Sequence, residues 1–234
     1  MFPLKDNVPT RTFPVVTVAL IVVNTAAWLW EARSGVDREV LRYGYYPCAL
    51  RGHCVAPATE FHHVAWPLGL LFSMFLHAGW VHIGGNMLFL WIFGNNVEDA
   101  MGRVRFLVFY LLAGVAAAAL QSAVTLGWAG DQGASVPNVG ASGAIAGVLG
   151  AYLILLPRAR VLSAVFVILI FFVDIPAIFF LGYWFLFQLW QGGFAIAHPQ
   201  SGGGVAFFAH VGGFAFGALA VWLFRVRAPL RPAY

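Results

Sequence analysis

The sequence predicts an all-α polytopic membrane protein with six transmembrane helices, and three observations lead to that prediction. Of the 234 residues, 61% are hydrophobic and only 9% are charged, and the mean hydropathy is +0.83. A soluble domain carries roughly 25% charged residues, so this chain has too few to cover a water-facing surface. Its length allows several apolar spans of about 20 residues each. The third observation is that nine of its 13 Lys and Arg residues fall on one side of the expected membrane, while Arg33, Arg38, Arg42 and Arg51 on the other side are offset by acidic residues.

The apolar runs place the spans within one expected membrane domain, residues 1–234. The expected spans lie at about 14–30, 80–96, 104–127, 141–157, 175–191 and 205–225, with the core of the domain at about 70–226. A long outer loop, 31–79, follows the first span, and its apolar stretch 64–76 is expected to lie at the membrane interface. The fold class therefore follows from the number and order of these runs.

The apolar run 161–191 is too long for one helix. Asp174 and Pro176 interrupt it, so it contains either two short spans or one span preceded by a connecting segment. The conformation of the segment before Asp174 is left open by the sequence.

The basic residues decide between these alternatives, because cytoplasmic loops carry an excess of Lys and Arg. With six spans, one side of the membrane holds Lys5, Arg11, Arg103, Arg105, Arg158, Arg160, Arg225, Arg227 and Arg231. A seventh span would move the last three to the other side. The charges therefore favour six spans with both termini in the cytoplasm. The net charge of +4 concerns this topology and indicates no nucleic-acid partner.

The two cysteines, Cys48 and Cys54, lie in one polar stretch of the outer loop. They can form a disulfide if that loop faces an oxidising compartment. Their spacing does not match a metal site, and no metal or cofactor is expected.

Polar residues inside a bilayer cost free energy, so each one needs a reason. His82 and Asn86 are four residues apart near the start of the second span and share a helix face. Ser142 opens the fourth span, and His210 lies near the start of the sixth. In the six-span topology these spans all run from outside to inside, so the four residues lie at a similar depth below the outer surface.

Nucleophilic catalysis is the chemistry that these residue types allow. A serine hydroxyl becomes a nucleophile when a histidine takes its proton, which His210 could do for Ser142. Acyl transfer also needs donors for the developing oxyanion. Asn86 and His82 are side-chain candidates, and Ser142 at a helix N-terminus supplies backbone N–H groups. Because no Asp or Glu lies at that depth, we expect a Ser–His dyad rather than a triad.

Each of these residues also has a structural interpretation. Ser142 stands beside Gly143 in a run of small residues that is typical of close helix packing. Gly213 and Gly217 form a G-x-x-x-G pair after His210, which predicts a closely packed neighbour; if that neighbour is the fourth span, His210 reaches Ser142. His210 alone could simply hydrogen-bond two helices together. His77 is expected to be structural and to hold the outer loop in place.

Together, the motifs resemble those of the rhomboid intramembrane serine proteases. "HAGWVHIGGN" resembles the H-x-x-x-N element of the family, and "GASGAIAGVLGAY", which begins at Gly140, resembles its G-x-S-G motif. "AHVGGFAFG" is similar to the A-H-x-x-G-x-x-x-G element, and "GNNVEDAMG" to the acidic turn into the third span. The matches cover about 70–226 in the family's order. One departure is Ala146, which stands where some members carry a tyrosine stacked on the histidine.

The resemblance implies a serine endopeptidase that cuts transmembrane segments of other membrane proteins, commonly after a small residue. It assigns Ser142 as the nucleophile, His210 as the base, and Asn86, His82 and the Ser142 N–H as oxyanion donors. The fifth span and the 192–204 loop would act as gate and cap.

Two other hypotheses come from different classes of protein. The first is a catalytically inactive relative that binds and escorts membrane proteins; such relatives usually lack the serine or the histidine. The second is a small transporter, but no inverted repeat is visible. We expect the location to be a bacterial inner membrane, with the active site opening to the outer side.

Overall fold

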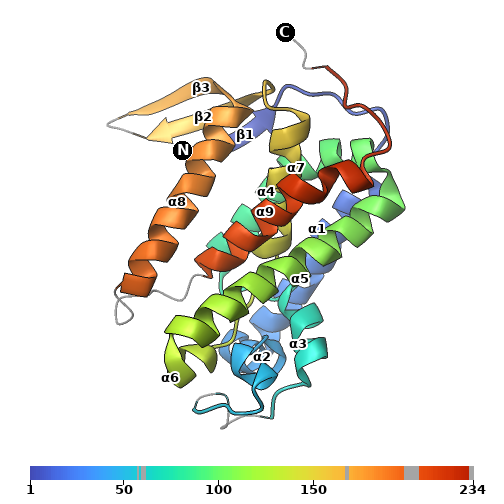
Figure 1. Cartoon of the computed structure of the whole chain (residues 1–234). Coiled ribbons are helices and arrows are strands. Elements are labelled where there is room, and N and C mark those ends of the chain that lie inside the picture. Colours follow the sequence, from blue (N-terminus) through green and yellow to red (C-terminus); the bar gives the residue numbers. More distant parts are fainter. Residues whose placement is uncertain (57, 59–61, 167–168, 198–205, 232–234) are drawn as a thin grey trace.

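The computed structural model describes residues 1–56, 58, 62–166, 169–197 and 206–231 and shows long helices gathered beneath a small sheet (Figure 1). In chain order the elements are β1 (Phe2–Asp6), α1 (Val15–Ser34), α2 (Val36–Tyr43), a short 3₁₀ turn (Pro47–Leu50), α3 (Trp66–Ser73), α4 (Trp80–Met101), α5 (Arg103–Trp128), α6 (Gly130–Ala134), α7 (Ser142–Leu155), β2 (Arg160–Phe166), β3 (Ile170–Pro176), α8 (Ala177–Ala197) and α9 (Phe207–Phe224).

Helices lie at all the positions where the sequence predicts membrane spans. Among the described residues, three of them (α1, α5 and α9) are long and apolar enough to cross a membrane by length and composition. The apolar helix α7 has 14 residues and is therefore about 21 Å long, shorter than the roughly 30 Å hydrocarbon core of a bilayer. The interfacial stretch predicted at 64–76 contains the short helix α3.

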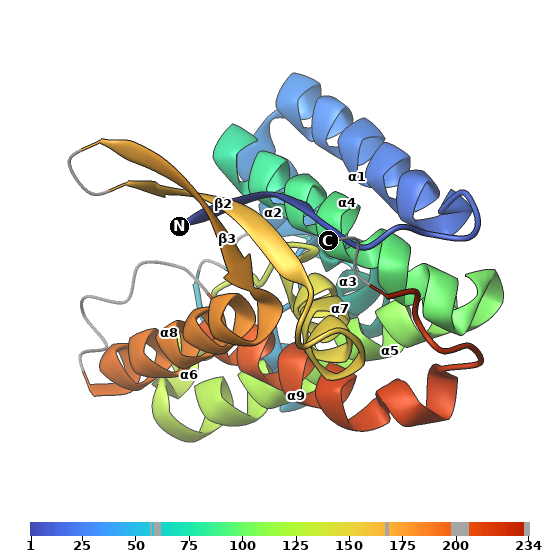
Figure 2. The same ribbon diagram turned by 90° about the horizontal axis from the view of Figure 1, so that it is seen from above.

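The central helix is α7, and Figure 2 shows it surrounded by α4, α5, α8 and α9, with α1 on the far side of α4. Its residues from Gly143 to Tyr152 are all buried. Helix α9 packs directly on it because both helices carry glycines where they cross. A Cβ atom at Gly213 would overlap the carbonyl oxygen of Gly143, and one at Gly217 would overlap that of Gly147. Side chains at these positions would force the two backbones apart.

The prediction of an all-α protein is wrong in one respect, because the structure contains a three-stranded sheet. Its strand order is β1-β2-β3, and both pairs are antiparallel. The segment left open before Asp174 forms the β2–β3 hairpin, and α8 follows it, so this part of the chain is a connecting segment followed by one helix. The hairpin residues are mostly β-branched or aromatic and suit a strand better than a helix.

The sheet and both chain termini lie at the same end of the bundle (Figure 1). At this end the acidic last turn of α4 contacts both terminal segments. Glu98 accepts hydrogen bonds from the backbone of Val16 and Thr17, which caps α1. Asp99 forms an ion pair of 2.8 Å with Arg11, and Arg11 also donates to the carbonyl of Ala228.

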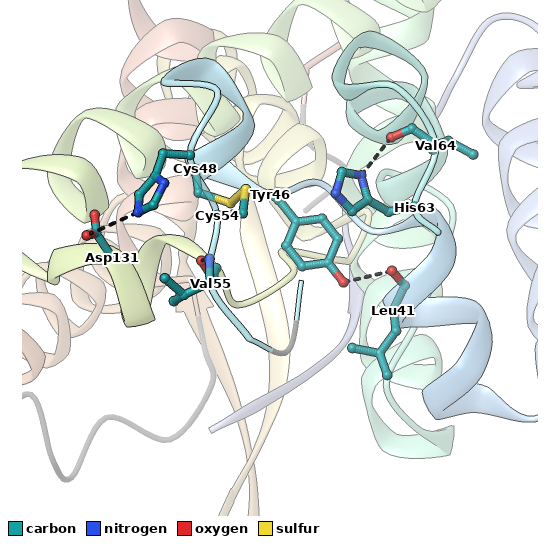
Figure 3. Close-up of a disulfide and its surroundings, with 10 residues drawn as sticks. Leu41, Tyr46, Cys48, Cys54, Val55, His63, Val64 and Asp131 are labelled. Atoms are coloured by element: carbon teal, nitrogen blue, oxygen red, sulfur yellow. Dashed lines mark hydrogen bonds and ion pairs between the residues drawn. A yellow bond between two sulfur atoms is a disulfide. The ribbon is translucent and has the colours of Figure 1, made fainter. Parts of the chain in front are cut away.

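At the opposite end, the outer loop is closed by a disulfide between Cys48 and Cys54 (Figure 3). The Cys48 side chain is 1% exposed and packs with Tyr46 and Ala134. The hydroxyl of Tyr46 donates to the carbonyl oxygen of Leu41. The disulfide that the sequence allowed is thus present, and it anchors the loop against α5 and α6.

Candidate active site

Ser142 and His210 come together where α7 and α9 cross. Ser142 is the first residue of α7, and His210 lies in the first turn of α9. The Nε2 atom of His210 is 2.8 Å from the Oγ atom of Ser142, a hydrogen bond between residues 68 positions apart in the sequence. The glycine contacts between these helices allow this distance, since a wider separation would leave the imidazole out of reach of the hydroxyl.

The other side of the His210 ring contacts helix α8. Its Nδ1 atom is 2.8 Å from the Oε1 atom of Gln188, and Gln188 is 6% exposed. The ring of Trp184, one turn earlier on α8, lies 5.7 Å from the imidazole, centroid to centroid, at an angle of 40°. Trp184 therefore provides the aromatic contact that Ala146 cannot make.

His82 and Asn86, both on α4, face the same space as Ser142 and His210. The Nδ1 atom of His82 accepts a hydrogen bond of 3.3 Å from the Ala78 N–H. The proton of a neutral His82 is then on Nε2, which makes that atom a donor. Asn86 is 8% exposed, and its Nδ2 donor is buried with no hydrogen-bond partner among the described residues. An unpaired buried donor is costly, and a ligand atom could satisfy it.

Gly140 separates His82 from Ser142. Its φ of +128° is in the region that favours glycine. A Cβ atom here would lie 2.8 Å from His82 Nε2 and 3.4 Å from Ser142 Oγ. Because the residue is glycine, the space between the serine and the donors remains open.

These residues line one cavity of about 610 Å³. Its walls come from α4, α7, α8 and α9 and from the segment just before Gly140, and they include His82, Asn86, Pro137, Asn138, Val139, Ser142, Trp184, Gln188 and His210. The size is in the range of ligand pockets, and most of the lining is apolar. An apolar wall with a few convergent polar groups suits an extended peptide or a helix end.

His77 lies beside the cavity, not in its lining. Its backbone N–H donates to the carboxylate of Glu31, 3.1 Å away, at the end of α1. Its Nδ1 atom is 3.2 Å from the carbonyl oxygen of Phe75, and its ring contacts that of His82 at 5.1 Å. The hydrogen bond to Glu31 joins the outer loop to α1. The ring contact restricts the orientation of the His82 imidazole.

Two residues of this site, Gln188 and Trp184, were missed by the sequence reasoning. The predicted dyad rested on the lack of an Asp or Glu at that depth, whereas the group that contacts His210 Nδ1 is a neutral amide. The available signal was Gln188 itself, a polar residue in the middle of an apolar helix, where such residues need a partner. Part of the expected cap, 198–204, lies outside the described residues.

The arrangement pairs the Ser142 hydroxyl with the His210 base. The side-chain donors of His82 and Asn86 lie across the cavity from them. The hydroxyl of Ser142 can lose its proton to His210 Nε2 as it attacks a carbonyl carbon. The first N–H groups of α7 have no acceptor within the helix, so they add to the donors from His82 and Asn86. Such a constellation fits acyl transfer. Among the described residues no group of three or more His, Cys, Asp or Glu could hold a metal.

Comparison with known proteins gives matches to rhomboid proteins over most of the chain. The family model described as the rhomboid domain matches residues 64–227. The mitochondrial rhomboid protein 1 of Saccharomyces cerevisiae is 29% identical over 164 residues, which cover 68% of this chain and 42% of the yeast protein. The rhomboid protease GluP of Bacillus subtilis is 39% identical over 84 residues, 36% of this chain and 15% of that protein.

Mitochondrial proteins are well represented among these relatives. The mitochondrial presenilin-associated rhomboid-like protein of Homo sapiens is 34% identical over 91 residues, 39% of this chain and 23% of that protein. The chain thus spans less than half the length of the curated relatives named here. Since the relatives include mitochondrial and bacterial proteins, the expected bacterial inner membrane is not supported. The match over residues 64–227 shows that the chain is an integral, multi-pass membrane protein of the rhomboid family.

Proposed function

We propose that the chain is an intramembrane serine endopeptidase that cleaves transmembrane segments of other membrane proteins. The observation that carries this proposal is the 2.8 Å hydrogen bond between Ser142 Oγ and His210 Nε2, in a cavity that also contains the Nδ2 donor of Asn86, which has no partner among the described residues. The cavity wall is formed mainly by helices of the bundle, so a substrate would reach Ser142 from within the membrane or from its surface.

The mechanism follows from the positions of the atoms. Ser142 Oγ attacks the scissile carbonyl carbon while His210 Nε2 takes the hydroxyl proton. The negative charge that develops on the carbonyl oxygen is stabilised by Asn86 Nδ2, His82 Nε2 and the N–H of Ser142. The protonated His210 then gives its proton to the leaving amine, and an acyl-serine forms. A water molecule, activated by the same histidine, attacks this ester and releases the second product.

The topology belongs to the same proposal. Six spans would place the sheet, both termini and the nine basic residues named above on the cytoplasmic side. The sheet and the termini lie at one end of the bundle (Figure 1), which supports this topology. Ser142 begins a helix of 14 residues that ends at the sheet, and this length supports a position for the serine below the outer surface. Helix α8 would form the gate, and its last residues, 192–197, belong to the expected cap.

The competing hypothesis is an inactive relative that binds and escorts membrane proteins. It is disfavoured because Ser142 and His210 are both present and hydrogen-bonded. Binding and escorting a client would not require a hydroxyl, a base and an unpaired amide donor in one cavity.

The test is cleavage of a transmembrane reporter by the purified protein in vesicles. We expect Ser142→Ala and His210→Ala each to reduce cleavage at least 1,000-fold, and a fluorophosphonate probe to label the unmodified protein but not Ser142→Ala. Matched controls are Ser34→Ala, at the end of α1, and His53→Ala, which is exposed in the outer loop. Undiminished cleavage by Ser142→Ala would refute the proposal, and an unlabelled parent protein would favour the inactive relative.

A further inference from the structure

His210 is held at both of its ring nitrogens, by residues from two different helices. Nε2 meets the Ser142 hydroxyl on α7, and Nδ1 meets the Gln188 side chain on α8, each at 2.8 Å. A dyad needs only the first of these contacts. The second contact needs an explanation, because Gln188 is a buried glutamine at the Nδ1 side of the His210 ring.

The atom that Gln188 presents to the ring decides which nitrogen carries the proton. Its Oε1 oxygen can only accept, so Nδ1 must be the donor. A neutral imidazole has one proton, and Nε2 is then free to accept the proton of Ser142. A donor in the place of Oε1 would fix the opposite tautomer, in which an Nε2–H points at the serine and cannot act as a base.

We propose that Gln188 is a positioning residue that completes a Ser142–His210–Gln188 triad with a neutral third member. This inference rests on the proposed peptidase function. Gln188 holds the tautomer and plane of the imidazole, as a carboxylate does in the Ser–His–Asp triad, and Trp184 covers the ring. A neutral amide does this in a buried site without placing an unpaired charge there.

The surroundings of His210 make this role specific. The groups that face the ring are Ser142 from α7, Gln188 and Trp184 from α8, and His82 from α4. Among the described residues around the ring, His82 is the titratable one, and no carboxylate competes for Nδ1. Because Gln188 belongs to α8, the orientation of the base depends on the position of that helix. A displacement of α8 would release Nδ1 and lower the reactivity of Ser142.

The experiment compares Gln188→Met, Gln188→Glu and the matched control Gln191→Met on the same helix. Methionine nearly preserves the volume of glutamine, but its thioether sulfur is only a weak acceptor for the Nδ1 proton. We expect Gln188→Met to lower kcat about 10- to 100-fold, because part of the imidazole population loses its productive tautomer, while KM changes less than threefold. Gln188→Glu keeps the acceptor and should restore kcat. It should also move the acidic limb of the pH–rate profile to higher pH, because a carboxylate stabilises the imidazolium.

A second readout separates this proposal from the peptidase proposal itself. The rate of fluorophosphonate labelling reports the reactivity of Ser142 without a peptide substrate. If the parent protein is not labelled at all, the proposed function fails and the role of Gln188 falls with it. If the parent protein is labelled and cleaves its substrate, but Gln188→Met labels and cleaves at the same rate with an unchanged pH profile, Gln188 has no positioning role and this inference alone is overturned. Equal losses in Gln188→Met and Gln191→Met would also overturn it.

Discussion

At the scale of single residues, the site depends on one position without a side chain. Gly140 combines a φ of +128° with a place between two functional side chains. It stands two positions before Ser142, and its N–H donates to the carbonyl oxygen of Ser73 at 2.8 Å. The backbone here is thus held from α3 while the space in front of it stays open, where the developing oxyanion would lie.

Gly140→Ala should therefore cause a large loss of cleavage and only a small loss of stability. The added methyl group would lie against His82 Nε2 and fill the proposed oxyanion position, so we expect kcat to fall at least 100-fold. Backbone strain should cost about 1 kcal/mol of unfolding free energy. Gly52→Ala is the matched control, with φ of +68° and no atom near the added Cβ. Reporter cleavage and thermal unfolding measure the two effects, and equal loss of activity in both variants would contradict the explanation.

At the scale of elements, the wall of the cavity is supported by the outer loop. Tyr45 and Asn138 form an antiparallel bridge, with backbone hydrogen bonds of 3.1 and 2.8 Å. The Val55 N–H donates to Ser135 Oγ at 2.9 Å. The Cys48–Cys54 disulfide joins these two contacts, since one of its cysteines lies near Tyr45 and the other next to Val55. Asn138 lines the cavity. The disulfide is therefore connected to the cavity wall by the Tyr45–Asn138 bridge and the Val55–Ser135 hydrogen bond.

Replacing both cysteines by serine should loosen this wall. We expect a loss of about 2 kcal/mol in unfolding free energy from the chain entropy that the short closed loop removes. KM for the transmembrane reporter should rise, while fluorophosphonate labelling of Ser142 should change little, because the base is held from α8 and α9. A reductant should reproduce both effects in the parent protein and have none in the double variant. Unchanged stability and KM after reduction would show that the loop supports the wall without its disulfide.

At the scale of the whole molecule, the first and the central parts of the chain meet at the sheet. Asp6 in β1 accepts a hydrogen bond of 2.5 Å from the Tyr152 hydroxyl near the end of α7. Burial raises the pKa of the Asp6 carboxyl to about 6, and the Tyr152 hydrogen bond offsets part of that rise. A carboxyl with a raised pKa favours its protonated form in the folded protein.

This raised pKa makes stability depend on pH. Between about pH 4 and pH 6 the folded protein holds a proton on Asp6 that the unfolded chain has released, so the free energy of unfolding falls as pH rises through that window. The total change is about 3 kcal/mol for a shift of this size. Asp6→Asn keeps an acceptor for Tyr152 and should remove this dependence. Thermal unfolding in detergent at pH 4.5 and pH 7.5 measures it, with the exposed Asp37→Asn as control, and an unaltered slope in Asp6→Asn would exclude Asp6 as its source.

The sequence by itself determined the properties that depend on local composition. Hydropathy located the long helices because an apolar run must be helical to satisfy its backbone in a membrane. The order of the polar motifs indicated the family, and the helical spacing placed His82 and Asn86 on one face. The expectation that His210 and Ser142 meet also came from the sequence, through the glycines that let α7 and α9 approach. Their catalytic roles remain a proposal.

The tertiary structure decided what depends on residues far apart in the chain. The sheet forms because residues 2–6 pair with a hairpin more than 150 positions later, and hydropathy carries no information about such pairing. Gln188 and Trp184 reach His210 because α8 packs beside α9, and nothing in their local sequence indicates that partner. A helix is stabilised by contacts within a few residues, whereas the orientation of a buried imidazole is fixed by side chains from other helices.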